Sequence, residues 1–274
     1  AAQNWEREYE GTFIDLGFLQ GKSTPCVFHH PDRDIRTVVH GDDFTSLGDE
    51  EQLRWLRQQL AEKYDLKVRA TLGPDSYDDK AVRILNRIVS WNKDDITYEP
   101  DQRHIEIIVK ALGLQDSSKG VTTPGVKPTT AEQIGTALSK EEQFHFRSMV
   151  MRLNYIAQDR PDIQYSVKEL ARCMSAPTSN DWEGLKRLGR YLVTHRRVVI
   201  VFRRQRNPSF LDSRVDTDYA GCLKTRRSTN GGALMIGSHC LKTWSSTQSV
   251  IALSSGEAEY YGIVKGASVL LGAI

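Results

Sequence analysis

Two adjacent aspartates, Asp42 and Asp43, follow Gly41 between two runs of apolar and β-branched residues, 35–40 and 44–47. Such runs predict two strands, and the short acidic segment between them predicts a hairpin turn. Adjacent carboxylates repel each other, so a pair at a tight turn is normally stabilised by a metal ion or a cationic side chain. An ordinary turn is the alternative, because Asp accepts hydrogen bonds from nearby backbone amides.

A second acidic group lies in the last third of the chain. Asp216 and Asp218 stand two residues apart in an extended run, so they share one face of a strand. Glu257 and Glu259 open an apolar helix after Ser254, where Glu257 fits a capping box and Glu259 can turn inward. A strand aspartate with a helix glutamate indicates a two-metal site, although such a site normally needs one more carboxylate. Solvated acids at a strand end and at a helix N-terminus are the alternative.

Basic residues are concentrated between residues 186 and 206, where no acidic residue interrupts them. A surface that faces phosphates is favoured next to metal-type carboxylates, and a solvated face is the alternative. A turn that ends in two glycines adds guanidinium and hydroxyl groups suited to phosphate or sugar contacts. The candidate nucleic-acid contacts are Arg196, Arg197, Arg203, Arg204, Arg226, Arg227, Ser228 and Thr229.

The bulk composition limits the class of protein. The 274 residues are enough for two or three compact domains, and 39% apolar with 26% charged residues fits a soluble globular protein. No apolar run reaches the length of a membrane span. Four scattered cysteines without a CxxC pair argue against a structural zinc site and a disulfide framework, and favour a reducing compartment. Because the chain opens on Ala1 in a helical pattern and ends in or just after a helix, we expect a piece of a longer protein.

Hydrophobic periodicity and turn residues predict a mixture of helices and hairpins. A segment rich in Ser, Thr, Gly and Pro, residues 115–137, separates two such regions and is the clearest linker. After it, Ser139 and Glu142 form a capping box, and three amphipathic helices follow. The expected strands that come next are 198–202, 213–219, 232–236 and 241–245, before the final helix.

The order of these motifs resembles part of a copia-type long-terminal-repeat retrotransposon Pol polyprotein. Residues 1–5 resemble the segment that enters the palm helix of its reverse transcriptase, and His40-Gly41-Asp42-Asp43 resembles the Tyr-x-Asp-Asp turn, with His40 in the aromatic position. Residues 153–163 are close to a connector signature. Motifs of the family's ribonuclease H are similar to four segments of this chain, residues 216–222, 226–231, 245–246 and 254–260.

The resemblance implies an α+β fold with a partial reverse-transcriptase palm, a helical connector and an incomplete ribonuclease H-like mixed sheet with a helix. It divides the chain into a palm and thumb remnant at 1–114, a linker at 115–138, the connector at 139–209 and a truncated ribonuclease H-like domain at 210–274. It also implies two magnesium (or manganese) ions at each site. Asp42 and Asp43 would serve polymerisation, Asp216 and Glu259 would serve RNA cleavage, and Asp218 would lie just outside the metal ligands.

Each implied metal site lacks a carboxylate, because the family's first polymerase aspartate lies upstream and its third ribonuclease H aspartate would follow Ile274. We therefore expect little or no catalysis by this chain. The expected partners are RNA–DNA hybrid, primer–template nucleic acid and the remainder of the polyprotein, and no membrane is expected among them. The expected location is inside the cell, in a cytoplasmic particle or in the nucleus. A non-catalytic nucleic-acid-binding remnant of a decayed or domesticated element is the alternative. A small-molecule metal hydrolase ranks last, because no paired-histidine motif such as HExxH occurs.

Overall fold

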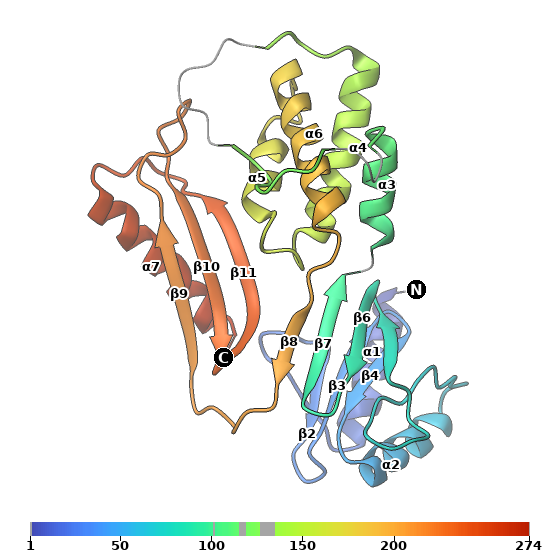
Figure 1. Ribbon diagram of the computed structural model, residues 1–274. Helices are drawn as coiled ribbons and strands as arrows, with labels where there is room; N and C mark the ends of the chain where they lie inside the picture. The colour runs from blue at the N-terminus through green and yellow to red at the C-terminus, as the bar shows by residue number, and fades with distance from the viewer. Residues whose placement is uncertain (1, 101, 115–118, 127–134, 274) are drawn as a thin grey trace. The chain divides into compact units, whose positions relative to one another are not determined.

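The computed structural model describes residues 2–100, 102–114, 119–126 and 135–273. The fold is α+β (Figure 1). The chain divides into two compact units, one that contains the residues up to Arg69 together with those from Gly272 onward, and one that covers Ala70–Leu271. Among the described residues, no helix combines the length and the apolar character needed to cross a membrane.

The first unit is a four-stranded antiparallel sheet with two helices. Large aromatic and aliphatic side chains fill its core, among them Phe13 and Phe28, whose rings stack 4.8 Å apart. The sheet order is β1-β2-β3-β4, so consecutive strands are neighbours joined by short turns. Its elements are α1 (Ala2–Asp15), β1 (Leu19–Gln20), β2 (Val27–His30), β3 (Ile35–His40), β4 (Asp43–Leu47) and α2 (Glu50–Ala61).

The second unit opens with three strands that form an antiparallel sheet with a strand from much later in the chain. The order is β5-β6-β7-β8, where β5 (Ala81–Ile84), β6 (Arg87–Trp91) and β7 (Asp95–Pro100) are consecutive and β8 (Ile200–Arg203) follows the helices. Leu85 and Asn86, which join β5 to β6, both have positive φ. Two residues with positive φ are typical of the tight turn that matches strand twist. The sequence pattern predicts one hairpin here, with strands at 82–91 and 96–99, and the structure divides the first of these into β5 and β6.

Four helices pack around one apolar core in the second unit (Figure 1). They are α3 (Arg103–Ala111), α4 (Lys140–Ile156), α5 (Gln164–Arg172) and α6 (Ser179–Thr194). The capping box predicted for α4 is confirmed, because the Ser139 hydroxyl accepts from Glu142 N and the Glu142 carboxylate accepts from Ser139 N. Since Ile105, Ile108 and Val109 of α3 belong to this core, α3 packs with the predicted connector rather than with residues before Arg69. The expected linker lies partly outside the described residues.

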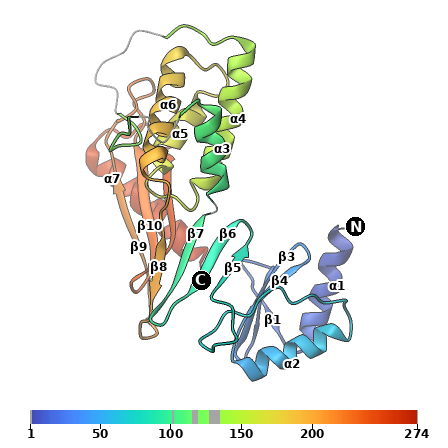
Figure 2. The ribbon, with the colours of Figure 1, turned by 45° about the vertical axis from the view of Figure 1, so that its right-hand side comes forward.

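The last sheet has the order β11-β10-β9 and carries helix α7 on one face (Figures 1 and 2). Its elements are β9 (Leu211–Thr217), β10 (Thr229–Ile236), β11 (His239–Thr247) and α7 (Ser255–Leu271). These described strands are all antiparallel, which corrects the mixed sheet expected from the sequence. The reason is physical: β10 and β11 are joined by a short turn and β9 and β10 by a short loop, and parallel neighbours would require a longer crossover.

Glycines allow α7 to approach the sheet closely. A Cβ on Gly262 would lie 2.5 Å from the Thr217 side chain, and one on Gly266 would lie 2.6 Å from that of Val215. Both distances are too short for a real side chain, so the helix packs on β9 only because these positions are Gly. The side chains of Val215 and Thr217 therefore face α7. Strand alternation turns Asp216 to the opposite face.

Candidate functional site

The first candidate site is the hairpin tip between β3 and β4, where the structure confirms the predicted turn. His40 pairs with Asp43 across a two-residue loop, and Gly41 has φ of +61°. Positive φ at the first loop residue is the requirement of a tight hairpin turn that glycine meets without strain. Trp5 of α1 donates from Nε1 to the Gly41 carbonyl at 2.6 Å and packs against Phe44, so α1 holds the hairpin in position.

At this tip Asp42 is exposed and Asp43 is half-buried. The Asp43 carboxylate pairs with the Arg69 guanidinium at 3.1 Å, which is the cationic partner that the adjacent negative charges require. Arg69 was not among the residues predicted from the sequence, because a single arginine 26 positions away carries no local signal.

The second candidate site is a pocket of about 370 Å³ on the sheet face opposite α7. Asp216 lies on this face in register with Gly231 of β10, and Gly231 is in register with Ser245 of β11. Asp218, just beyond the strand end, also lines the pocket and accepts a hydrogen bond from Thr229 N. The structure therefore brings the two aspartates of the predicted motif into one concave surface.

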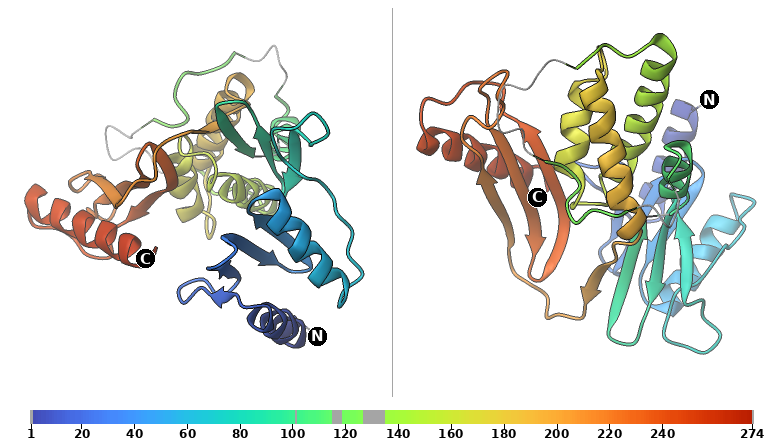
Figure 3. Two further views of the ribbon diagram at one scale, coloured as in Figure 1. Left: turned by 90° about the horizontal axis from the view of Figure 1, so that it is seen from below. Right: turned by 45° about the horizontal axis from the view of Figure 1, so that its top comes forward.

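Helix α5 forms the other wall of this pocket. Pro161, Gln164 and Tyr165 line it, and the views in Figure 3 agree that α7 and α5 lie on opposite sides of the β9–β11 sheet. Gln164 donates from Nε2 to the Thr243 carbonyl at 3.4 Å, and Lys168 donates from Nζ to the Thr229 hydroxyl at 2.9 Å. The predicted connector is thus fixed to two strands of the predicted ribonuclease H-like sheet.

Glu259 is not among the residues that line this pocket. It belongs to α7, next to Ala258, which packs against the sheet with no exposed surface. Within the part of the chain that the structure describes, no three His, Cys, Asp or Glu side chains cluster closely enough to hold a metal. The pairing of Asp216 with Glu259 at one ion therefore stays a prediction from the resemblance.

The start of α7 confirms the expected cap. Glu257 N donates to the Ser254 hydroxyl at 3.1 Å, and the Glu257 carboxylate accepts from Leu253 N at 2.7 Å. Glu257 also accepts a hydrogen bond from the Tyr261 hydroxyl, which raises the pKa of Tyr261. Glu257 therefore caps the N-terminus of α7, as the sequence predicted.

The predicted nucleic-acid contacts divide into exposed and engaged side chains. Arg203 and Arg204 are exposed at the end of β8, and Arg226 and Arg227 are exposed on the loop between β9 and β10. By contrast, Arg197 forms a two-bond ion pair with Glu99, with both nitrogen–oxygen distances at 3.0 Å. This ion pair raises the pKa of Arg197. It also connects the segment after α6 to β7, the strand that contains Glu99.

Two hydroxyls of the predicted loop have structural partners. Ser228 has no exposed surface, and its hydroxyl accepts from Ala220 N at 2.9 Å, where Ala220 has φ of +52°. Thr229 accepts from Lys168. The expectation that Ser228 contacts nucleic acid is wrong for this structure, because the side chain stabilises the left-handed turn of its own loop instead.

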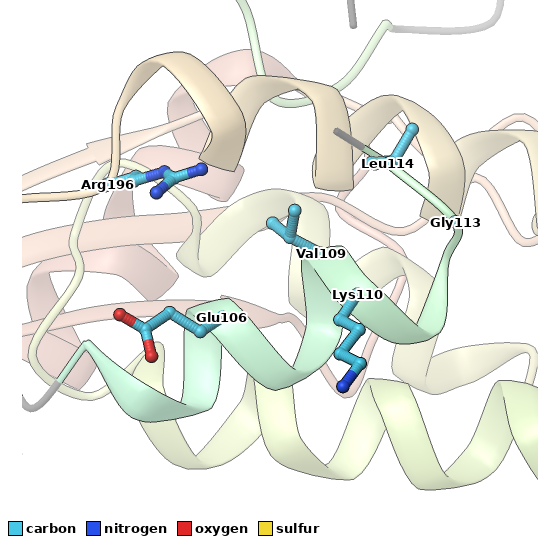
Figure 4. Close-up of a pocket in the computed structure, with 6 residues that line it drawn as sticks. All are labelled: Glu106, Val109, Lys110, Gly113, Leu114 and Arg196. Carbon is cyan, nitrogen blue, oxygen red and sulfur yellow. The ribbon is translucent and has the colours of Figure 1, made fainter. Parts of the chain in front are cut away.

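Arg196 lines another pocket, of about 410 Å³, together with residues of α3. Figure 4 shows the Arg196 side chain extending over α3 at the end of the pocket where Glu106 lies, with Leu114 at the other end. Glu106 and Lys110 place charges of both signs here. This mixed lining favours a packing role for Arg196 between α3 and the segment after α6.

Near the connector signature, buried charges join distant segments. Arg160 is fully buried, and its guanidinium donates to both carboxylate oxygens of Asp162, at 2.9 and 2.7 Å. Arg87 donates to Asp159 at 3.0 Å, and the Tyr98 hydroxyl donates to the other Asp159 oxygen at 2.6 Å. Burial, followed by the hydrogen bond to Asp159, raises the pKa of Tyr98 to about 12. The signature residues therefore stabilise the fold.

Comparison with known proteins shows what this chain is similar to. Over 158 residues, 56% of this chain and 10% of the relative, it is 34% identical to the retrovirus-related Pol polyprotein from transposon RE2 of Arabidopsis thaliana. It is 26% identical over 275 aligned residues, 95% of this chain and 20% of the relative, to the retrovirus-related Pol polyprotein from transposon TNT 1-94 of Nicotiana tabacum. Over 104 residues it is 35% identical to the secreted RxLR effector protein 161 of Plasmopara viticola, 38% of this chain and 72% of the relative.

No protein-family model and no solved structure matches the chain. The chain spans about a tenth to a fifth of the length of the Pol polyproteins it matches. One of these matches runs along nearly the whole chain, through the acidic hairpin, the helices and the final sheet. The chain belongs to the retrovirus-related Pol polyproteins of copia-type transposons.

Proposed function

We propose that this chain is the part of a copia-type Pol polyprotein that holds RNA–DNA hybrid, and that its parent protein copies RNA into DNA and degrades the RNA strand. In this proposal the first unit belongs to the reverse transcriptase, and the β9–β11 sheet with α7 belongs to the ribonuclease H. The observation that carries it is the pocket in which Asp216 and Asp218 lie opposite α5.

The proposal assigns binding and not cleavage to the arrangement of carboxylates described above. Asp43 is paired with Arg69, and no three His, Cys, Asp or Glu side chains of the described residues cluster closely enough to hold a metal. Two ions that share a substrate phosphate need several carboxylates within a few ångströms. We therefore expect little or no cleavage of RNA–DNA hybrid by this chain in magnesium or manganese.

The exposed guanidiniums would supply the attraction to the nucleic acid. Arg203, Arg204, Arg226 and Arg227 are predicted contacts with exposed side chains. Contacts between arginine and phosphate release counterions, so they weaken with salt and do not depend on base sequence. This mode of binding suits a protein that must hold RNA–DNA hybrids of any sequence.

A salt titration of binding tests the proposal. The affinity of the chain for a fluorescent RNA–DNA hybrid would be measured by anisotropy across a range of salt concentrations. We expect the double variant Arg203→Gln, Arg204→Gln to lower the log–log slope by up to about 0.9 for each phosphate that an arginine no longer neutralises. The matched control is Lys186→Gln, because Lys186 is already paired with Glu183 at 3.1 Å. An unchanged slope in the double variant would place both arginines on a solvated face.

A second candidate function is a non-catalytic remnant of a decayed or domesticated element. It is favoured by the described residues, among which no three His, Cys, Asp or Glu side chains cluster closely enough to hold a metal. The two candidates differ in the parent polyprotein. If that protein is an active nuclease, Asp216→Asn with Glu259→Gln should abolish cleavage of the hybrid, and retained cleavage would show that other carboxylates perform it.

A further inference from the structure

The acidic turn between β3 and β4 is in contact with a cation that the chain itself supplies. The Arg69 guanidinium lies 3.1 Å from an Asp43 carboxylate oxygen, and the two side chains are 69% and 38% exposed. Asp42, the preceding residue, is exposed as well. Two carboxylates and one guanidinium leave this turn with an excess of negative charge, so it still attracts a further cation.

The turn is held rigidly, whereas Arg69 belongs to an irregular segment. Gly41 has φ of +61°, and Trp5 donates from Nε1 to the Gly41 carbonyl at 2.6 Å. Asp43 is the first residue of β4, so its backbone is fixed by the sheet. Residues 65–71, by contrast, form neither helix nor strand, and Arg69 reaches the turn through its long side chain. A change of partner at Asp43 would therefore move the arginine and not the carboxylate.

The oxygen donors of this turn fit the magnesium or manganese ion that the resemblance implies. Both ions prefer oxygen ligands, and Mg²⁺ is usually bound through one or two carboxylates while water or phosphate fills its other positions. Asp42 and Asp43 supply two carboxylates on adjacent residues. An ion bound to Asp43 would repel the guanidinium that contacts the same carboxylate. Arg69 and a divalent ion therefore compete for one ligand.

The exposure of this ion pair makes the exchange reversible. Water and salt screen an exposed pair, so it contributes little to stability and is readily replaced. The pair between Arg160 and Asp162 differs, because the Arg160 side chain has no exposed surface and breaking such a pair leaves a buried charge uncompensated. The contact between Arg69 and Asp43 is thus suited to exchange rather than to holding the fold together.

We propose that Arg69 and a divalent metal ion compete for Asp43, so that the guanidinium lowers the affinity of the turn for the ion and is released into solvent when the ion binds. The proposal rests on the assignment of the first unit to the reverse transcriptase. It adds an autoinhibitory contact within that unit, and it makes Arg69 a residue that acts through Asp43 and not on a substrate.

Metal binding by the complete chain tests the proposal in the absence of nucleic acid. Free Mn²⁺ would be measured by electron paramagnetic resonance during titration of the original chain, Arg69→Gln, Arg69→Lys and Asp43→Asn. Arg54→Gln is the matched control, because Arg54 is 74% exposed and forms a similar surface pair with Glu50 at 2.7 Å. In parallel, peptide mass spectrometry would follow the modification of Arg69 and Arg54 by phenylglyoxal with and without Mn²⁺.

Arg69→Gln should bind Mn²⁺ about two- to fivefold more tightly than the original chain, because an exposed pair no longer competes with the ion. Arg69→Lys keeps the charge and should stay close to the original chain, Asp43→Asn should bind more weakly, and Arg54→Gln should leave the affinity unchanged. Mn²⁺ should also speed the modification of Arg69, since a released guanidinium is more accessible, and leave that of Arg54 as it was.

Three results would overturn the proposal. They are an Arg69→Gln affinity no higher than that of the original chain, an equal gain in Arg54→Gln, and a modification rate at Arg69 that does not respond to Mn²⁺. Equally strong binding by Asp43→Asn would place the ion elsewhere and overturn it too. Failure here is distinct from failure of the proposed function, which the titration with RNA–DNA hybrid decides.

Discussion

Replacement of Arg160 by Met should destabilise the helical bundle more than any surface substitution. Arg160 has no exposed surface, and its guanidinium makes four hydrogen bonds. Two of them hold Asp162, and the others reach the carbonyls of His195 and Arg196 just after α6, at 2.8 and 3.3 Å. Met fills similar space but offers no donor to any of these acceptors.

The expected magnitude follows from what remains after the change. The Asp162 side chain is only 22% exposed and would retain one partner, the Tyr191 hydroxyl at 3.1 Å. Removing one member of a buried ion pair costs about 3–5 kcal/mol, because the other charge is left uncompensated. Two carbonyls also lose their donor, which adds to the cost where water cannot replace it. Because whole domains are stable by roughly 5–15 kcal/mol, a loss of about 3–5 kcal/mol is a large fraction.

Hydrogen–deuterium exchange in increasing urea would measure this effect locally, through peptides from α4 and α6. Lys186→Gln is the control, since its exposed pair with Glu183 should contribute about 0–1 kcal/mol. Arg160→Lys should fall between the two, because an ammonium group keeps the charge but cannot span the carboxylate and both carbonyls. If Arg160→Met lowers the free energy of unfolding by less than about 1 kcal/mol, as the control should, the conclusion that the connector-signature residues stabilise the fold is refuted.

Four further predictions concern other parts of the chain. Burial favours the neutral thiol of Cys222, but hydrogen bonds from Thr225 and Arg172 lower its pKa to about 7, so alkylation should reach half its maximal rate near pH 7 and at higher pH in Arg172→Gln. Burial and Asp159 raise the pKa of Tyr98 to about 12 from about 10 in the unfolded chain, so its contribution to stability should be complete below pH 10 and lost towards pH 12; absorbance titration checks this, and Asp159→Asn should lower the midpoint. Ser139→Ala should cost about 0.5–2 kcal/mol in thermal unfolding through loss of the capping box, whereas Ser139→Thr should cost little. Gly232→Ala should destabilise the last sheet and alter the tryptophan fluorescence, because its Cβ would meet the Trp244 ring, while Gly231→Ala should leave both unchanged.

Local signals in the sequence predicted the elements whose causes are themselves local. The Gly41 turn, the Ser139 cap and the Ser254 cap depend on residues within four positions of each other, and all three are confirmed. The amphipathic period predicted α4, α5 and α6 for the same reason. Which helices share a core was harder to predict from the sequence. Helix α3 packs against α4, α5 and α6, although a long segment separates it from them in the chain.

The candidate site shows where local reasoning ends. The i, i+2 spacing of Asp216 and Asp218 predicted a shared surface, and the pocket contains both. It could not show which face of the sheet α7 would cover. Nor could it show that Tyr165 would join the site, because an exposed aromatic residue on a helix has many possible partners.

By itself, the sequence determined the kinds of element, their caps and turns, and the family to which the chain belongs. The elements, caps and turns follow from spacing along the backbone, where period, cap and turn chemistry act over a few residues. The family follows from the resemblance of the motifs. Only the tertiary structure decided which charges would meet: Arg69 with Asp43, Arg197 with Glu99, and α5 with the face that carries Asp216. Such pairings depend on how helices and strands that are tens of residues apart in the sequence pack together. In the last sheet, Gly262 and Gly266 let α7 pack closely on one face, and this leaves the other face to α5.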